Sequence, residues 1–327
     1  MILSVLKKRP RNSSVELLRI LSMTMIVMFH FCANAYRYNS ADFVCGHDSE
    51  TLIKLIFHAL GQTGVPVFMF ISGYYGIHFK KNRLIDIILQ CFVYIFLFYM
   101  VAHIFYPNGI GGKLLILSAF CISGQWFMHA YITIYLFSDS INATLDKLSI
   151  RSFSALILVM MYISVGLWVY KESALNMFTL LEIYAVARYV RRFLSDMWKA
   201  RMVYLVFPSL LLFLLPVFYG WYAGNYSAIM PYVNKYYNPF ILIFAICLVV
   251  SAERFYFYNK CINYLASSVL ACYLIHTSFY FPPLVTSFFH FEKYNLGWIL
   301  LLSLMIVVGC SLVDKLRLYI QNKFINL

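Results

Sequence analysis

Residues 16–35 read ELLRILSMTMIVMFHFCANA, an apolar run interrupted by Arg19 near its start and His30 near its middle. At about 100° and 1.5 Å per helical residue, these two side chains fall on the same helix face, ~16 Å apart along the axis. This is about half the hydrocarbon thickness of a bilayer. In a membrane-spanning helix, Arg19 would lie at one surface and His30 near the midplane, where an ionisable group without a partner or a cavity is costly. We therefore predict a functional site along this stripe.

The composition indicates a polytopic membrane protein. The chain has 327 residues, of which 62% are hydrophobic and 12% charged, and its mean hydropathy is +0.76. About a quarter of the residues of a soluble domain are charged. The eight cysteines are scattered without a Cys-x-x-Cys pair, so we expect neither a disulfide framework nor a zinc site. Cys45, His47 and Asp48 share one loop, but we expect no metal there.

Apolar windows of about 20 residues predict an all-α protein with about ten transmembrane helices. The predicted spans are 16–35, 52–76, 84–106, 121–138, 152–170, 174–190, 202–220, 238–256, 262–281 and 295–313. Residues 113–120 either extend the fourth span or form a re-entrant segment. No internal repeat is evident, so we expect a single membrane domain over residues 1–327. Its basic N-terminus (1–14) and its C-terminal tail (314–327) are both expected in the cytoplasm.

The basic residues give an independent test of this topology. With the N-terminus inside, the inner segments hold 19 of the 26 lysines and arginines, and the outer segments hold six. Such a bias fits the positive-inside rule with both termini cytoplasmic. Topology therefore explains the net charge of +13, and no nucleic-acid partner is expected. The basic start and an Ala-Asn-Ala triplet at 33–35 also resemble a cleavable signal peptide, but Arg19 and His30 favour an uncleaved first helix.

Four stretches resemble, in order and spacing, the bacterial membrane acyltransferase-3 family, whose members O-acylate cell-surface polysaccharides. The first is Arg19, ten residues, then His30. The others are GQTGVPVFMFISGYYG at 61–76, with Met69 where the family has a second Phe, QWFMHAYITIYL at 125–136 and ACYLIHTSF at 271–279. The resemblance runs through nearly the whole chain.

The resemblance implies an acyl donor, normally acetyl-CoA, that arrives from the cytoplasm, and an acceptor hydroxyl on a glycan at the outer side. Arg19, with Lys80 and Arg83, would bind the phosphates of CoA. His30 would be the general base or, alternatively, an acyl-carrying nucleophile. The alternatives without a catalytic role are a structural histidine at position 30 and a snorkelling arginine at position 19 that pairs with Glu16. Lys80 and Arg83 would then be charges that only set the membrane topology.

Four further residues are candidates for the substrate site. Glycine and proline interrupt the second predicted span, so Ser72 and freed N–H groups either stabilise an oxyanion or mark close helix packing. Trp126 and Tyr131 either hold a sugar ring or belong to an interface belt. His276 is a second proton carrier, a partner of His30, or a structural side chain.

The sequence therefore predicts a multi-pass O-acyltransferase, most specifically an O-acetyltransferase, in a bacterial inner membrane. Its expected partners are an acyl-CoA, a glycan or lipid-linked oligosaccharide and the bilayer; no metal is expected. A transporter or flippase of a glycan or lipid-linked sugar, and an anchoring protein without a small-molecule site, are the alternatives. Against a proton-coupled transporter, the acidic residues within the spans are placed near the cytoplasmic edge. They are Glu16, Asp86, Glu182 and Glu253. The acyl group, the sugar and the oligomeric state stay open.

Overall fold

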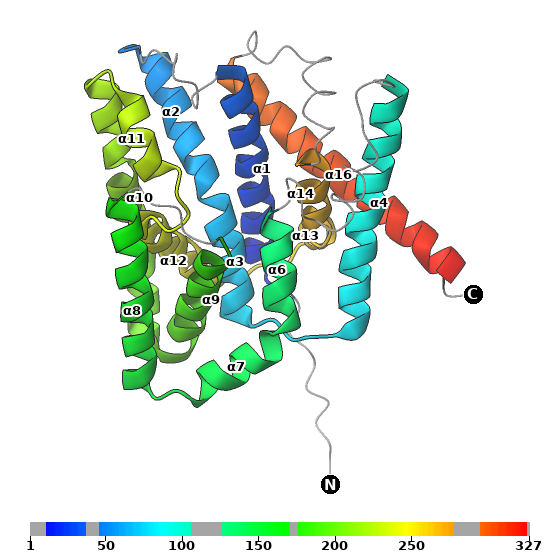
Figure 1. Ribbon diagram of the computed structural model, residues 1–327, viewed down its shortest axis with the longest axis horizontal. Coiled ribbons are helices and arrows are strands. Elements are labelled where there is room, and N and C mark those ends of the chain that lie inside the picture. The colour runs from blue at the N-terminus through cyan, green and yellow to red at the C-terminus, as the bar shows by residue number, and fades with distance from the viewer. Residues whose placement is uncertain (1–10, 37–45, 106–125, 171–175, 278–294, 326–327) are drawn as a thin grey trace.

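The computed structural model describes residues 11–36, 46–105, 126–170, 176–277 and 295–325. Within these residues all regular secondary structure is α-helical, which confirms the predicted fold class (Figure 1). The predicted segment at 113–120 and Cys45 lie outside the described residues.

The helices follow the predicted apolar runs, with short additions between them. The described helices are α1 (Ser13–Tyr36), α2 (Ser49–Gln62), α3 (Gly64–Tyr75), α4 (Lys81–Phe105), α6 (Trp126–Leu136), α7 (Ser138–Lys147), α8 (Ile150–Val169), α9 (Asn176–Phe193), α10 (Asp196–Tyr222), α11 (Tyr226–Val233), α12 (Pro239–Arg254), α13 (Lys260–Ala266), α14 (Val269–His276) and α16 (Leu296–Ile325). The predicted second span is divided between α2 and α3, and the ninth between α13 and α14. The polar helix α7 and the short helix α11 were not predicted.

Six of the described segments are long and apolar enough to cross a membrane. They are α1, the α2–α3 pair, α4, α8, α10 and α16. The helices α6 and α12 have 11 and 16 residues, and α13 and α14 are shorter still. The structure thus supports a multi-pass membrane protein, and the full set of ten spans stays a prediction.

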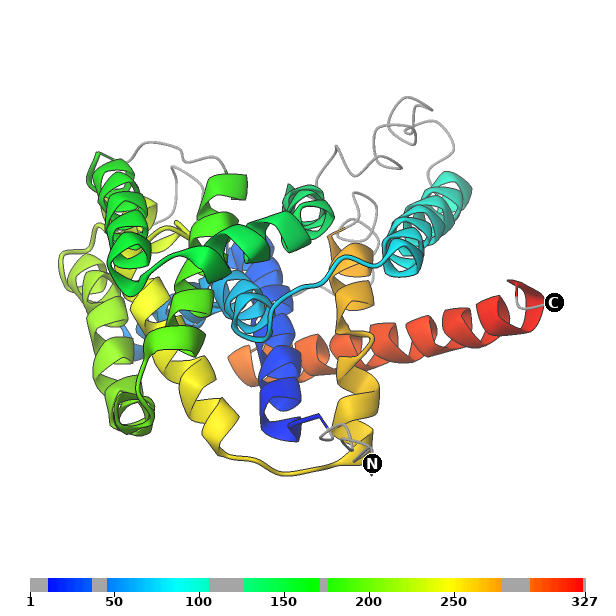
Figure 2. The same ribbon diagram turned by 90° about the horizontal axis from the view of Figure 1, so that it is seen from below.

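The first helix, α1, is the centre of the bundle. It packs against α2, α3, α12, α13, α14 and α16. The view from below shows α1 enclosed among these neighbours (Figure 2). Helices α4, α8 and α10 instead expose many large apolar side chains, as expected of surfaces that face lipid. The polar stripe of α1 therefore lies inside the protein.

Glycines at the bend between α2 and α3 allow α1 to approach closely. A Cβ atom added at Gly64 would lie 2.7 Å from the carbonyl oxygen of Ser22, and one at Gly61 would lie 2.3 Å from Cβ of Phe29. At the bend, the Thr63 N–H donates to the Leu60 carbonyl at 3.0 Å. The backbone contacts support the close-packing interpretation of this segment, as is usual for small residues between membrane helices.

Contacts between the connections group them at two ends of the bundle, and which end faces the cytoplasm stays a prediction. Asn142 of α7 donates to the carbonyl of Ile77, which precedes α4, at 2.6 Å. Arg188, near the end of α9, pairs with Asp146 of α7 at 2.6 Å. All three segments were predicted to lie inside. At the other end, the Trp221 indole of α10 donates to the carbonyl before α2 at 3.2 Å, joining two segments predicted to lie outside.

The predicted tail from 314 begins within a helix, because α16 continues to Ile325. Asp314 is 2% exposed and accepts hydrogen bonds from Gln90 at 2.9 Å, Tyr94 at 2.8 Å and Arg317 at 2.7 Å. Gln90 and Tyr94 belong to α4, whose outer surface is largely exposed. This buried polar network therefore ties α4 to α16.

We predict that Gly64→Ala destabilises the protein, because the new Cβ would press on the α1 backbone at Ser22 and Ile26. Overpacking of this kind costs about 1–3 kcal/mol. The thermal midpoint in detergent should fall. Gly166→Ala in α8 is the matched control, since a Cβ there meets nothing within 4 Å, and its midpoint should stay or rise. Equal midpoints for the two variants would contradict this packing.

We also predict that Asp314→Ala lowers the thermal midpoint more than any surface aspartate variant. It leaves Arg317, Gln90 and Tyr94 without their common acceptor, and breaking a buried ionic network costs about 3–5 kcal/mol. The control is Asp196→Ala, whose side chain is 97% exposed and pairs with Lys199 at 3.4 Å. Such exposed pairs contribute about 0–1 kcal/mol. A midpoint for Asp314→Ala as high as that of the control would exclude the network as the tie between the helices.

Candidate active site

His30 forms a pair with His276, which follows it by 246 residues in the sequence. Nδ1 of His30 lies 3.0 Å from Nε2 of His276, and the ring centroids are 5.1 Å apart. His276 is 3% exposed and ends α14, where its Nδ1 lies 2.6 Å from the carbonyl oxygen of Cys272. The structure thus brings together two residues that the sequence singled out separately.

A small cavity of about 50 Å³ adjoins His30. Its walls are mostly apolar and aromatic, with a threonine at one side; they comprise Ile26, Phe29, His30, Gly61, Val65, Trp126, Tyr236, Tyr273 and Thr277. The Trp126 and Tyr236 rings pack at a centroid distance of 5.2 Å. Trp126 is half-buried and lines the same cavity as His30, as the substrate-site interpretation requires.

A larger cavity of about 400 Å³ lies at Arg19. Its lining combines three arginines with apolar and hydroxyl side chains: Arg11, Arg19, Phe68, Ser72, Arg83, Phe127, Tyr131, Ala266, Ser267, Val269, Leu270 and Leu318. Cavities of this size bind drug-sized ligands, and arginines are suited to phosphate groups. The larger cavity is therefore a candidate site for an anionic ligand.

The two cavities are stacked along the same four helices. On α1, Arg19 lines the larger cavity and His30 the smaller one. Trp126 lines the smaller cavity and Tyr131, one turn later on α6, the larger one. Helix α3 and the α13–α14 segment likewise contribute to both. The predicted same-face geometry of α1 therefore corresponds to two separate spaces along this helix, one basic and one aromatic.

Glu16 holds the guanidinium of Arg19. Nη1 of Arg19 donates to both carboxylate oxygens of Glu16, at 3.1 and 3.2 Å, and Glu16 is 6% exposed. The alternative interpretation of Arg19, a snorkelling arginine, predicted this pairing with Glu16. The guanidinium also lines the larger cavity, and this contact occupies only one of its three nitrogens. Pairing with Glu16 and ligand binding are therefore compatible.

The other predicted residues divide into two groups. Ser72 and Tyr131 both line the larger cavity, and the Ser72 hydroxyl donates to the Phe68 carbonyl at 3.0 Å. Ser72 therefore does not adjoin His30, which disfavours the predicted oxyanion role. Arg83 lines the larger cavity. Lys80 does not belong to the described lining; its backbone N–H donates to the Tyr135 hydroxyl at 3.1 Å, in the turn before α4.

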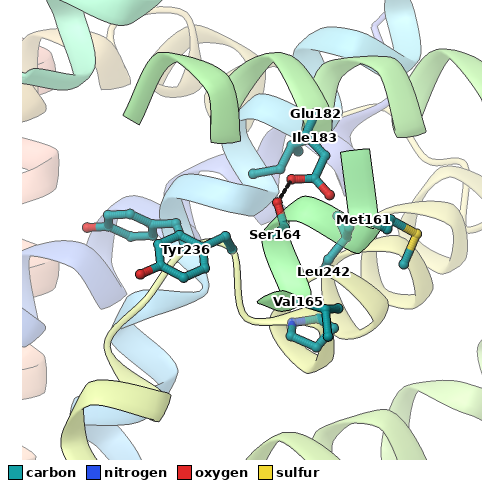
Figure 3. Close-up of a pocket in the computed structure, with 9 residues that line it drawn as sticks. Met161, Ser164, Val165, Glu182, Ile183, Tyr236 and Leu242 are labelled. Atoms are coloured by element: carbon teal, nitrogen blue, oxygen red, sulfur yellow. Dashed lines mark hydrogen bonds between the residues drawn. The ribbon is translucent and has the colours of Figure 1, made fainter. Parts of the chain in front are cut away.

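The prediction for Glu182 was wrong. It was placed near the cytoplasmic edge, but it lies six residues into α9, is 3% exposed and accepts a hydrogen bond from Ser164 of α8. Figure 3 shows the two side chains pointing toward one another. The space beside them has a volume of only about 10 Å³, roughly that of one water. The carboxyl group is therefore buried and satisfied by its neighbouring helix.

Sequence reasoning missed several side chains of the two cavities. Arg11 was counted only as a topogenic charge, and Tyr236 lies in a loop before α12 that carried no motif. Tyr236 lines both the space beside Glu182 and the cavity at His30. Burial raises the pKa of the Tyr236 hydroxyl to about 12, so it stays protonated at neutral pH. Its neutral O–H can serve as a hydrogen-bond donor.

The helical bundle and the cavities at Arg19 and His30 indicate a multi-pass membrane protein with a candidate binding site inside the bundle. Residues 12–314, nearly the whole chain, match the acyltransferase-3 family through its acyltransferase domain. The chain belongs to this family, which confirms the resemblance seen in the motifs. No curated protein and no solved structure matches the chain. The protein is therefore a membrane acyltransferase, and the transporter alternative is not favoured.

Proposed function

We propose that this protein is an O-acetyltransferase that takes an acetyl group from acetyl-CoA and transfers it to a hydroxyl of a cell-surface polysaccharide or of its lipid-linked precursor. The bacterial inner membrane is the proposed location, with the CoA arriving from the cytoplasm. The observation that supports this proposal is the stacking of a basic cavity and a histidine cavity along α1.

The larger cavity has the chemistry expected of a CoA site. CoA carries several phosphate charges on a long, thin arm that ends in the thioester. Arg11, Arg19 and Arg83 line this cavity. A guanidinium group can donate two parallel hydrogen bonds to two oxygens of one phosphate. Arg19 and His30 are ~16 Å apart along the helix axis, a distance that the arm can cover. The donor would thus be bound by its phosphates while its thioester reaches the second cavity.

The smaller cavity has the chemistry expected of the reacting end. A volume of about 50 Å³ suits a two-carbon acyl group better than a long chain. The aromatic side chains in its walls would limit the access of water, which protects a thioester from hydrolysis. His30 is the histidine among the described residues that line it. We assign His30 as the general base that takes the proton of the acceptor hydroxyl.

The acceptor would approach His30 along the rings of Trp126 and Tyr236, so that only its reacting hydroxyl reaches the smaller cavity. These rings pack together at the end of the site away from Arg19. An aromatic surface suits a sugar ring, since the apolar face of the sugar stacks on it while its hydroxyls stay available. In the predicted topology this end faces the outer side, where a surface glycan or its precursor is available.

His30→Ala should lower kcat for acetyl transfer about 100-fold or more, because a positioned general base contributes about 10²–10⁴-fold. The measurement is release of free CoA thiol from acetyl-CoA by membranes that contain the full chain and an acceptor glycan. His129→Ala is the matched control, since His129 lies on α6 with an exposed side chain, and it should keep the activity. Undiminished activity in correctly inserted His30→Ala would exclude this base.

Arg19→Ala should raise the KM for acetyl-CoA about 10–100-fold, because a hydrogen bond to a charged group contributes about 1.5–3 kcal/mol. Weaker binding of CoA itself should be visible by titration calorimetry on the purified protein. Arg151→Ala is the control, an exposed arginine of α8 on the predicted inner side that does not line the larger cavity. Equal CoA affinity in both variants would argue against a donor site at Arg19.

A further inference from the structure

The hydrogen bonds of His276 determine where its proton lies. Its Nδ1 is 2.6 Å from the carbonyl oxygen of Cys272, and a carbonyl oxygen only accepts, so Nδ1 carries the proton. His276 is 3% exposed, and it meets His30 and the Cys272 carbonyl through its ring nitrogens and the Tyr273 ring edge-on. A resting charge in such surroundings is costly. The imidazole is therefore neutral, with a lone pair on Nε2.

This arrangement determines the tautomer of His30 as well. The lone pair of His276 Nε2 faces Nδ1 of His30 at 3.0 Å, so that Nδ1 must be the donor. Neutral His30 then has its proton on Nδ1 and a bare lone pair on Nε2. An unconstrained histidine in water favours the opposite tautomer. The buried pair thus fixes the form in which Nε2 is ready to accept a proton.

We propose that His276 is a positioning residue for acyl transfer: through its hydrogen bond to Nδ1, it keeps Nε2 of His30 unprotonated and stabilises the charge that His30 acquires. This inference rests on the proposed function, because it assumes that His30 accepts the proton of the hydroxyl. It adds a role for a residue on a different helix, outside the lining of the smaller cavity.

The reaction balances with these two residues. His30 Nε2 takes the hydroxyl proton while the hydroxyl oxygen forms a bond to the carbonyl carbon of the thioester. When the tetrahedral intermediate collapses, the carbon–sulfur bond breaks and its electron pair stays on sulfur. The proton then moves from His30 Nε2 to the sulfur, which leaves an ester, a free thiol and two neutral imidazoles. His276 shares the positive charge only between these two proton transfers.

The position of His276 suits it to that charge. It is the last residue of α14, and the C-terminal end of a helix carries partial negative charge that favours an imidazolium. The Cys272 carbonyl accepts its Nδ1 proton throughout the reaction. The partner of the base in hydrolase triads is a carboxylate, which performs both functions at once. Here the His276 imidazole, the C-terminal end of α14 and the Cys272 carbonyl together perform these two functions, which are to orient the base and to stabilise its charge.

The test is nitrogen NMR of the full-length protein in detergent, labelled with ¹⁵N-histidine. The two ring nitrogens of a neutral imidazole have well-separated shifts, and the His30 signals are identified by their loss in His30→Asn. We expect Nδ1–H and a bare Nε2 for His30, and a change of that pattern in His276→Phe. An Nε2–H form of His30, or a pattern unaffected by His276→Phe, overturns the proposal.

Activity provides the second measurement. His276→Phe should lower kcat about 100-fold, within the range of proton-transfer catalysis, with the KM for acetyl-CoA unchanged. His276→Gln keeps an acceptor near the place of Nε2 and should recover most of that loss. Equal loss in the Phe and Gln variants overturns the positioning role. If the unmodified protein shows the expected tautomer but transfers no acyl group from any acyl-CoA, the proposed function fails and the role with it, whereas transfer activity with the wrong tautomer overturns the role alone.

Discussion

The structure depends on the burial of polar groups along one face of α1. Within a bilayer an ionisable side chain is tolerated when it meets a partner or a cavity. Arg19 has Glu16 at 3.1 Å and His30 has His276 at 3.0 Å, and each also adjoins a cavity. Both partners lie on the protein side of the helix. The stripe therefore requires α1 to be enclosed, and its neighbours enclose it.

The close packing of neighbouring helices around α1 depends in turn on the glycines at the bend between α2 and α3. Gly61 and Gly64 bring two backbones into direct contact, which large residues would prevent. Gly73 does the same between α3 and α9, where a Cβ would lie 2.7 Å from the Tyr184 carbonyl. Helix α3 is therefore fixed on two sides, against α1 and against α9. On the remaining surface of α3, Val65 lines the smaller cavity and Ser72 lines the larger one.

Features that arise from local geometry were predictable from the sequence. The apolar periodicity is sufficient to identify helices, and the spacing of Arg19 and His30 is sufficient to place them on one face, because helix geometry is fixed by the backbone. The pairing of His30 with His276 was only one of three interpretations, since it depends on how α14 packs against α1. Tyr236 carried no signal, because a loop residue reaches a cavity only through tertiary structure.

Two errors have a common cause. Helix α7 was not predicted because apolar runs identify membrane-spanning helices, whereas α7 is a polar helix on the surface. Glu182 was placed near the cytoplasmic edge, although it lies at the middle of the predicted span 174–190. In the structure Ser164 of α8 satisfies it from a neighbouring helix. Hydropathy describes each segment alone, whereas the cost of a buried polar group depends on its partners.

The unequal sizes of the two cavities bear on how the two substrates of the proposed acyl transfer would be kept apart. The space of about 400 Å³ has room for a large anionic ligand, whereas the space of about 50 Å³ at His30 has room only for a small group. A substrate that enters from the side of Arg19 can therefore present only a small group at His30. Under the proposed function, CoA itself does not cross the bundle. The two reactants meet at one imidazole from opposite sides, and the acyl group alone moves between them.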